Sequence, residues 1–146
     1  MQIRPYLFFD GRCEEALNFY RDALGAEVTA LLRFSDSPEP PPAGMLPPGA
    51  ENKVMHAQLR IGADEIMVSD GNCGGQPQFQ GMSLSLLLPD AASAEQRFAA
   101  LGAGGEVRLP LHQTFFAERF GNVVDRFGVS WMVLTAPAPA TPGAAA

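Results

Sequence analysis

Two histidines, His56 and His112, carry the side-chain type that ionises near neutral pH without help from its surroundings. His56 lies in an alternating run whose other polar members are Gln58 and Arg60. Successive side chains of a strand point to opposite faces, so these polar residues are expected to share one face. We expect His56 to be the acid or base of that face and Arg60 to be a fixed positive charge for an anionic group. The alternative is that this face simply contacts water.

Two cysteines offer thiols without a base placed beside them. Cys13 opens a predicted helix, whose dipole lowers the pKa of a thiol at that end, and Cys73 lies in the glycine-rich loop 70–80. A nucleophilic thiol needs an adjacent base, and nothing in the sequence places a histidine there. Without CxxC spacing or a high cysteine density, both are expected to be free thiols in a reducing compartment.

Composition argues against several classes of partner. The chain has 146 residues, 47% of them hydrophobic, which suits one domain with a sizeable core. Its ten basic residues are scattered and its formal net charge is −6, which argues against nucleic acid or an anionic membrane as a partner. The N-terminal residues do not resemble a signal peptide, and no apolar run has the length of a membrane span. We therefore expect a cytoplasmic protein.

Hydrophobic periodicity and turn residues predict eight strands and two helices. In 13–24 the apolar residues recur at helical spacing, and Gly25 follows where a helix ends. Short or alternating apolar runs bounded by Gly, Pro and Asp predict strands. The expected order is strand 3–9, helix 13–24, strands 27–34, 53–61 and 65–69, then strand 82–88, helix 91–101, and strands 106–111, 118–124 and 129–135.

The second half repeats the element order of the first. The run Ala-Leu-Gly-Ala-Glu-Val at 23–28 recurs as Ala-Leu-Gly-Ala-Gly-Gly-Glu-Val at 100–107. Each copy lies between the end of a predicted helix and the start of the next predicted strand. The predicted fold class is therefore α+β, with two βαβββ modules at about 1–75 and 80–136. Together they are expected to form a single domain of residues 1–136.

Two segments offer few side chains for a core. Residues 35–52 are rich in Pro and Gly and are expected to form a long mobile loop, either a functional flap or a disordered excursion. Residues 137–146 contain only Ala, Pro, Thr and Gly and are expected to be a disordered tail.

Hairpin register adds residues to the face of His56. A two-residue turn at 62–63 places His56 opposite Ser69 and Gln58 opposite Met67. Each helix must cover one face of its own sheet, which leaves the other face free to line a cleft. These four residues are expected to share that free face.

The same parity test applies to the second half. Ser83 and Ser85 fall on one face of the strand 82–88, where two small hydroxyls leave room for a ligand. Trp131 falls on the opposite face from Met132, so Trp131 is expected to pack under a helix.

Six segments carry a family resemblance: 5–9 with Asp10-Gly11, 16–20 with Leu24-Gly25-Ala26, 53–57, Ser69-Asp70-Gly71, Phe120-Gly121 and 125–131. Together they resemble the vicinal-oxygen-chelate superfamily, also called the glyoxalase and bleomycin-resistance fold, and within it the PhnB-like branch. The resemblance implies two βαβββ modules paired into an incomplete eight-stranded barrel with the helices outside. It also implies a ligand on the concave face, often around a divalent metal, and a homodimer. Members of this branch are often labelled demethylubiquinone methyltransferases, although this chain shows no glycine-rich cofactor turn after a parallel strand.

The resemblance also indicates where a metal would bind. Metal-dependent members take ligands from the first strand of each module and from a Glu on the last strand. Here Met132 stands at the position of that Glu, and the first strands offer Tyr6, Phe8, Ser83 and Ser85. None of these is a good ligand for a transition metal at neutral pH, so we expect neither a metal nor another cofactor.

The leading hypothesis is a small-molecule binding protein or metal-free enzyme with its ligand on the concave sheet face. His56 is the candidate catalytic residue. The candidate ligand-binding residues are Tyr6, Phe8, Gln58, Arg60, Ser69, Ser83, Ser85 and Met132. Two alternatives stay open: a metal-dependent lyase or dioxygenase, with an unusual site of His56 and Asp70 or Glu118, and a drug-sequestering protein of the resistance type.

Overall fold

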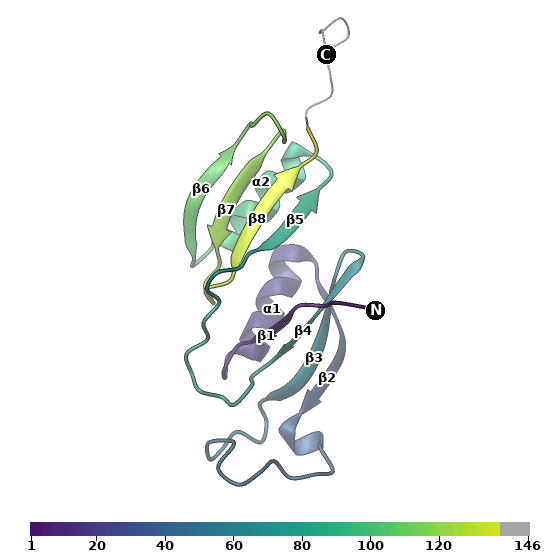
Figure 1. The fold of residues 1–146 in the computed structure, drawn as a ribbon, viewed down its shortest axis with the longest axis vertical. Coiled ribbons are helices and arrows are strands. Elements are labelled where there is room, and N and C mark those ends of the chain that lie inside the picture. Colours follow the sequence, from purple (N-terminus) through teal and green to yellow (C-terminus); the bar gives the residue numbers. More distant parts are fainter. Residues whose placement is uncertain (138–146) are drawn as a thin grey trace, which may run out of the picture. The chain divides into compact units, whose positions relative to one another are not determined.

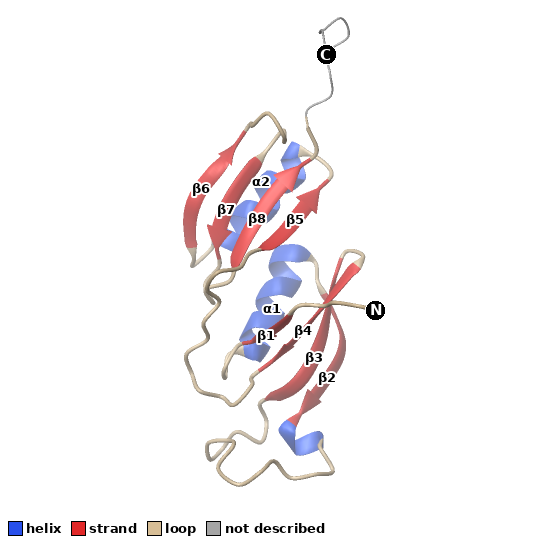
Figure 2. Cartoon of the chain, in the orientation of Figure 1, coloured by secondary structure: helices blue, strands red, loops and turns tan. Residues whose placement is uncertain are grey.

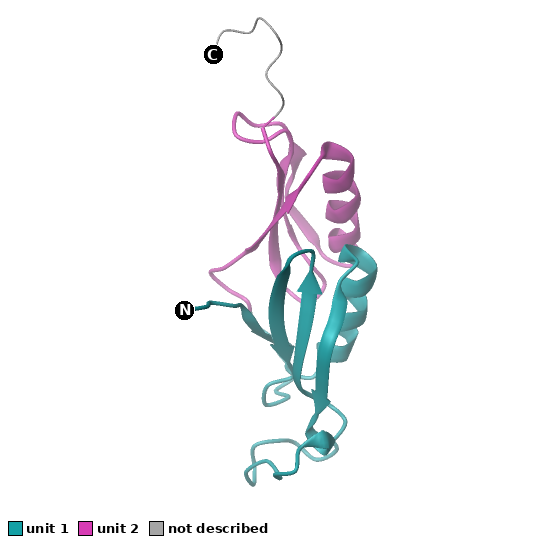
Figure 3. Cartoon of the chain, turned by 90° about the vertical axis from the view of Figure 1, so that its right-hand side faces the viewer, with its two compact units in different colours: residues 1–78 teal, residues 79–146 magenta. Residues whose placement is uncertain are grey.

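The computed structural model of the chain describes residues 1–137. It divides into two compact units, Met1–Gln78 and Phe79–Ala146, and each is described by itself (Figure 3). All but the first residue of the expected tail at 137–146 lies outside the described residues. The expectation of a single domain over 1–136 stays a prediction.

The first unit is a four-stranded sheet with one α-helix on one of its faces (Figures 1 and 3). Its elements are β1 (Tyr6–Phe8), α1 (Cys13–Leu24), β2 (Glu27–Arg33), the 3₁₀ turn η1 (Phe34–Asp36), β3 (Val54–Ile61) and β4 (Asp64–Ser69). The strand order is β1-β4-β3-β2, in which β1 runs parallel to β4 and the other neighbours are antiparallel.

The second unit has the same topology (Figure 2). Its elements are β5 (Leu84–Leu88), α2 (Ala91–Gly102), β6 (Glu106–His112), β7 (Phe120–Val124) and β8 (Ser130–Thr135). The order β5-β8-β7-β6 again puts the first strand parallel to the last. The predicted α+β class with two βαβββ modules is confirmed, and strand pairing forms two open four-stranded sheets rather than one closed barrel.

The short sequence repeat marks equivalent points of the two modules, because each copy spans a helix end and the start of the next strand. In the first copy Gly25 adopts a left-handed conformation (φ 64°) and donates its N–H to the carbonyl of Arg21. Glycine reaches this conformation without a Cβ clash, so it ends α1 and turns the chain into β2.

Several predicted boundaries are wrong by one to three residues; the strands expected at 82–88 and 118–124, for example, begin at Leu84 and Phe120. The first strand begins at Tyr6 instead of Ile3, because Pro5 has no N–H to give and contributes only its carbonyl, which accepts from Met67 N. The predicted start of the loop 35–52 falls inside the 3₁₀ turn η1. Ser35 N donates to the carbonyl of Glu51, and this hydrogen bond joins the two ends of the loop.

Each helix buries its apolar stripe against its own sheet. In unit 1, Tyr20 of α1 and Leu59 of β3 are 0% exposed. In unit 2, Trp131 is buried as predicted, and its indole N–H donates to the Asp125 carboxylate at 2.9 Å. The opposite face of each sheet has no helix of its own unit over it (Figure 3), and we call it the open face. No helix within residues 1–137 is long and apolar enough to span a membrane.

Candidate functional site

The predicted residues of the first module share the open face of the first sheet. Tyr6 and Gln58 both pair with Met67, and Phe8 pairs with Ser69, so these cross-strand neighbours line one face. The next residues along the strands, such as Leu7 and Leu59, point the other way and are buried. The register predicted from the two-residue hairpin is confirmed by the pairing of Gln58 with Met67.

Three aromatic rings lie together on this open face. The Tyr6 ring is 5.0 Å from that of Phe8 and 5.6 Å from that of His56, measured between centroids. Tyr6 Oη and His56 Nδ1 are 3.0 Å apart, a hydrogen bond across the sheet from β1 to β3. Tyr6 and Phe8 keep 37% and 52% of their surface exposed, so the rings are accessible. We call Tyr6, Phe8 and His56 the aromatic triad.

The Tyr6–His56 hydrogen bond leaves at least one polar group available in either tautomer. When the tyrosine hydroxyl donates to Nδ1, the His56 Nε2–H is left as a donor. When Nδ1–H donates instead, Nε2 becomes an acceptor and the tyrosine hydroxyl is free to donate. The pair can therefore offer a ligand either a donor or an acceptor.

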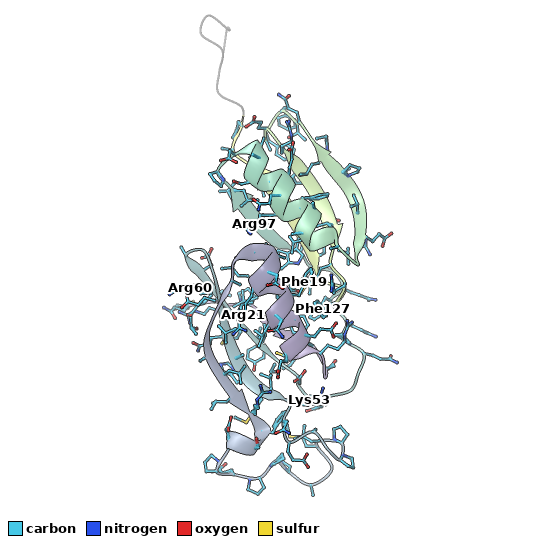
Figure 4. All side chains as sticks on the ribbon, turned by 180° about the vertical axis from the view of Figure 1, so that it is seen from behind. Phe19, Arg21, Lys53, Arg60, Arg97 and Phe127 are labelled. Carbon is cyan, nitrogen blue, oxygen red and sulfur yellow. The ribbon has the colours of Figure 1, made fainter. Side chains whose placement is uncertain are left out.

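Arg60 and Ser69 lie on this side of the sheet but already have partners. The Arg60 guanidinium, near the end of β3 (Figure 4), forms an ion pair with Glu27 of the neighbouring strand β2. The pair is exposed, so a ligand anion would compete with Glu27 for the charge. Ser69 is 2% exposed, and its hydroxyl accepts a hydrogen bond from Gly71 N at 3.1 Å. Its observed role is to hold the turn after β4.

The predicted residues of the second module lie on the open face of the second sheet. Ser85 pairs with Met132, and Ser83 lies just before β5 with its Oγ 2.5 Å from Ser130 Oγ. Asn122 Nδ2 donates to Ser130 Oγ at 2.9 Å. Sequence reasoning missed Asn122 and Ser130, although the parity test used for Met132 would have found both.

His112 does not join His56 among the described contacts. Its Nδ1 lies 2.9 Å from the carbonyl oxygen of Pro110, and its ring meets that of Phe120 edge-on at 6.3 Å. Phe116 contacts Phe120 in turn, and Phe115 is 97% exposed. This is a second aromatic group, confined to the second unit.

Asp70 explains much of the local structure around α1. Its buried carboxylate accepts hydrogen bonds from the backbone N–H groups of Gly11, Cys13 and Val54 at 2.7 to 2.8 Å. It thereby ties the turn after β1, the start of α1 and the start of β3 to the end of β4. Both of its oxygens are used by the backbone, so Asp70 is a structural group.

Neither thiol is activated. Burial, reinforced by the neighbouring Asp70 and Glu14 charges, raises the pKa of Cys13 far above its ordinary value. The expectation that the helix dipole lowers this pKa is wrong, because desolvation of the thiolate outweighs the dipole. Burial and the Asp70 charge also raise the pKa of Cys73. Within residues 1–137, no three His, Cys, Asp or Glu side chains form a group that could hold a metal ion.

The first unit also contains a cleft of about 420 Å³ at the root of the loop between η1 and β3. Its lining residues are Gly11, Glu14, Arg33, Gly49, Asn52, Lys53 and Asp70. Lys53 lies beside this root (Figure 4). The sequence indicated only an unusual loop here, because the charged residues that meet at its base lie far apart along the chain: Glu14, Arg33, Lys53 and Asp70. We call this cavity the loop-base cleft.

Comparison with known proteins places the chain in a family. Residues 1–134 match the model of the family described as 3-demethylubiquinone-9 3-methyltransferase. The chain belongs to this family. Its relatives include protein YjdN of Escherichia coli, 35% identical over 140 residues, which cover 91% of this chain and 94% of YjdN.

Solved structures agree with this family assignment. The structure of PA1353 from Pseudomonas aeruginosa is 42% identical and covers 94% of this chain and 99% of its own, with a TM-score of 0.80. A Bacillus cereus protein described as a putative 3-demethylubiquinone-9 3-methyltransferase, PhnB protein, is 28% identical and covers 93% and 100%, with a TM-score of 0.76. A glyoxylase/bleomycin resistance protein/dioxygenase domain from Frankia shares the fold alone, at 13% identity over 92% and 94% of the two chains and a TM-score of 0.65. The family thus has the glyoxalase and bleomycin-resistance fold that the sequence motifs indicated.

Proposed function

We propose that this protein binds a small organic molecule on the open face of its first sheet, as a binding protein or as an enzyme that needs no metal. The observation that carries the proposal is the Tyr6–His56 hydrogen bond within an exposed aromatic triad. An aromatic surface with a single polar pair is typical of small-molecule sites, which are mostly apolar with a few placed polar groups. His56 is the proposed acid, base or orienting group.

The neighbours of the triad support a flat, partly apolar ligand. Leu32 pairs with His56 across the sheet and is 46% exposed, and Met67 lies between Tyr6 and Gln58 in the strand register. Leu32 on β2 extends the apolar surface beyond His56, and Met67 on β4 lies between the two strands that carry the polar pair. Stacking on an aromatic ring contributes about 0.5–1.5 kcal/mol beyond area burial, which favours a ligand that carries a ring.

Methyl transfer, the activity in the family's description, is not part of the proposal. A methyl-donor cofactor of the nucleoside type would use the turn between a parallel strand and a helix, where free backbone N–H groups and glycines receive it. The turn between β1 and α1 does not fit that group, because Gly11 N and Cys13 N already donate to the buried Asp70 carboxylate. We therefore derive no step through such a cofactor.

The test is a thermal-shift screen of small aromatic and aliphatic metabolites on the wild-type protein, followed by three variants. His56→Leu is expected to abolish the shift of a ligand that uses the polar pair, whereas His56→Gln should keep part of it, because glutamine still forms hydrogen bonds. His112→Leu is the matched control and should leave the shift intact. If His56→Leu preserves every ligand-induced shift, the open face of the first sheet is not the site.

A cytoplasmic homodimer is the proposed state of the protein. The net charge of −6 supports the location, and exposed apolar side chains outside the aromatic triad, such as Leu87 at 69%, support the dimer. Light scattering at micromolar concentration is expected to give the mass of a dimer. A monomer under these conditions would contradict this part of the proposal.

A further inference from the structure

We infer that the loop-base cleft is a second binding site, separate from the aromatic triad, and that it takes a small carboxylate or phosphate anion. Its volume of about 420 Å³ is within the range of small-molecule sites. Two cations line its wall: Arg33 is the last residue of β2, and Lys53 immediately precedes β3. The ligand class follows from which hydrogen-bonding groups in that wall are already used.

The acceptors of the wall are largely occupied. Asp70 is 1% exposed, and its carboxylate receives three backbone N–H groups. The carbonyl of Gly11 accepts from Lys53 Nζ at 2.8 Å, and that of Asn52 accepts from Arg33 Nη1 at 2.7 Å. An incoming cation would therefore compete with backbone N–H groups for Asp70 and with Lys53 and Arg33 for the two carbonyls.

The donors of the wall are only partly occupied. Lys53 Nζ has three N–H bonds, and the structure shows one protein partner for them, the Gly11 carbonyl. Arg33 uses Nη1 for both Glu14 and Asn52, and no hydrogen bond of its Nε or Nη2 appears among the described contacts. A wall with spare cationic donors and committed acceptors fits an acceptor-rich anion.

Glu14 acts as a built-in competitor for such an anion. Its carboxylate lies 2.5 Å from Arg33 Nη1, in the position that a ligand carboxylate or phosphate oxygen would take. The Glu14 side chain is 57% exposed, so it can turn into water when an anion replaces it. Removing its charge should therefore strengthen anion binding, whereas removing the charge of Lys53 should weaken it.

The experiment titrates inorganic phosphate and succinate into ¹⁵N-labelled protein and follows the backbone amides of Gly11 and Gly49, which line the cleft. Glu14→Gln is expected to tighten the binding of both probes about three- to fivefold, the scale of one exposed ion pair. Lys53→Gln is expected to weaken it by a similar factor or more. Arg108→Gln removes an equal charge from exposed β6 and serves as the control, with binding unchanged.

The outcomes separate this inference from the proposed function. Saturable chemical-shift changes at Gly11 and Gly49 support the site if the fitted affinity rises in Glu14→Gln and falls in Lys53→Gln. Tighter binding of phosphate or of succinate then identifies the class of anion. Non-saturable shifts, or equal responses of Lys53→Gln and Arg108→Gln, overturn it. Neither result depends on His56, so the ligand of the open face can still be found or missed independently.

Discussion

Replacing Asp70 by Asn tests whether one buried carboxylate organises the first unit. The wild-type group receives Gly11 N and Cys13 N on Oδ1 at 2.8 Å and Val54 N on Oδ2 at 2.7 Å. Asparagine keeps one acceptor oxygen. Its NH₂ group, a donor, then faces at least one backbone N–H, which loses its acceptor. Each hydrogen bond to a charged group contributes about 1.5–3 kcal/mol, and a buried donor left without a partner costs about 1–3 kcal/mol.

The expected loss is therefore about 3–5 kcal/mol in the free energy of unfolding, a large share of the roughly 5–15 kcal/mol typical of a domain. Urea denaturation at neutral pH, followed by circular dichroism, measures it. Asp22→Asn makes the same chemical change on an exposed position of α1 and should stay within about 0.5 kcal/mol of wild type. If the two variants differ by less than about 1 kcal/mol, the Asp70 hydrogen bonds do not organise the unit as argued.

Four further predictions concern packing, pH, thiol reactivity and metal content. Gly105→Ala should destabilise the protein by about 2–3 kcal/mol in urea denaturation, because a Cβ there overlaps the last carbonyl of β7, whereas Gly74→Ala meets open space and should be nearly neutral. The ion pair with Arg33 lowers the pKa of Glu14, so the stability difference between wild type and Glu14→Gln should be present above about pH 5 and fade as pH falls through the folded-state pKa; a constant difference would contradict this. A disulfide reagent at mildly alkaline pH should label Cys73 in the native protein and Cys13 only after unfolding, as mass spectrometry of the labelled peptides would show. Labelling of Cys13 before Cys73 would contradict this. Metal analysis of the purified protein should find no stoichiometric transition metal, and one tightly held equivalent would favour the lyase or dioxygenase alternative.

The architecture could be predicted from local patterns because its elements have strong local causes. The helix α1 has the bounds that the sequence predicts, since apolar spacing marks its length and a left-handed glycine marks its end. The turn at 62–63 fixes the pairing of β3 with β4, and a one-residue slip would move every polar residue of β3 to the buried face. Alternation and this turn together are therefore enough to place Gln58 on the open face.

The candidate site could be predicted only in part. Alternation shows which residues share a face, but it cannot show which of them touch across non-neighbouring strands. The Tyr6–His56 hydrogen bond joins residues 50 positions apart, over the intervening strand β4. The partner of Arg60 and the burial of Ser69 are likewise set by neighbours from other strands and turns.

The order of the elements, their periodicity and the repeat of the βαβββ module follow from the amino-acid sequence alone, because they depend on side chains two, three or four positions apart. The state of the charged and polar groups depends instead on how the elements pack in three dimensions. Burial raises the pKa of Cys13 although the helix dipole lowers it. The Asp70 carboxylate accepts three backbone hydrogen bonds, and Glu14, Arg33 and Lys53 line the loop-base cleft. Desolvation and hydrogen bonding act over a few ångströms in space, and separation along the chain does not reveal which groups come that close.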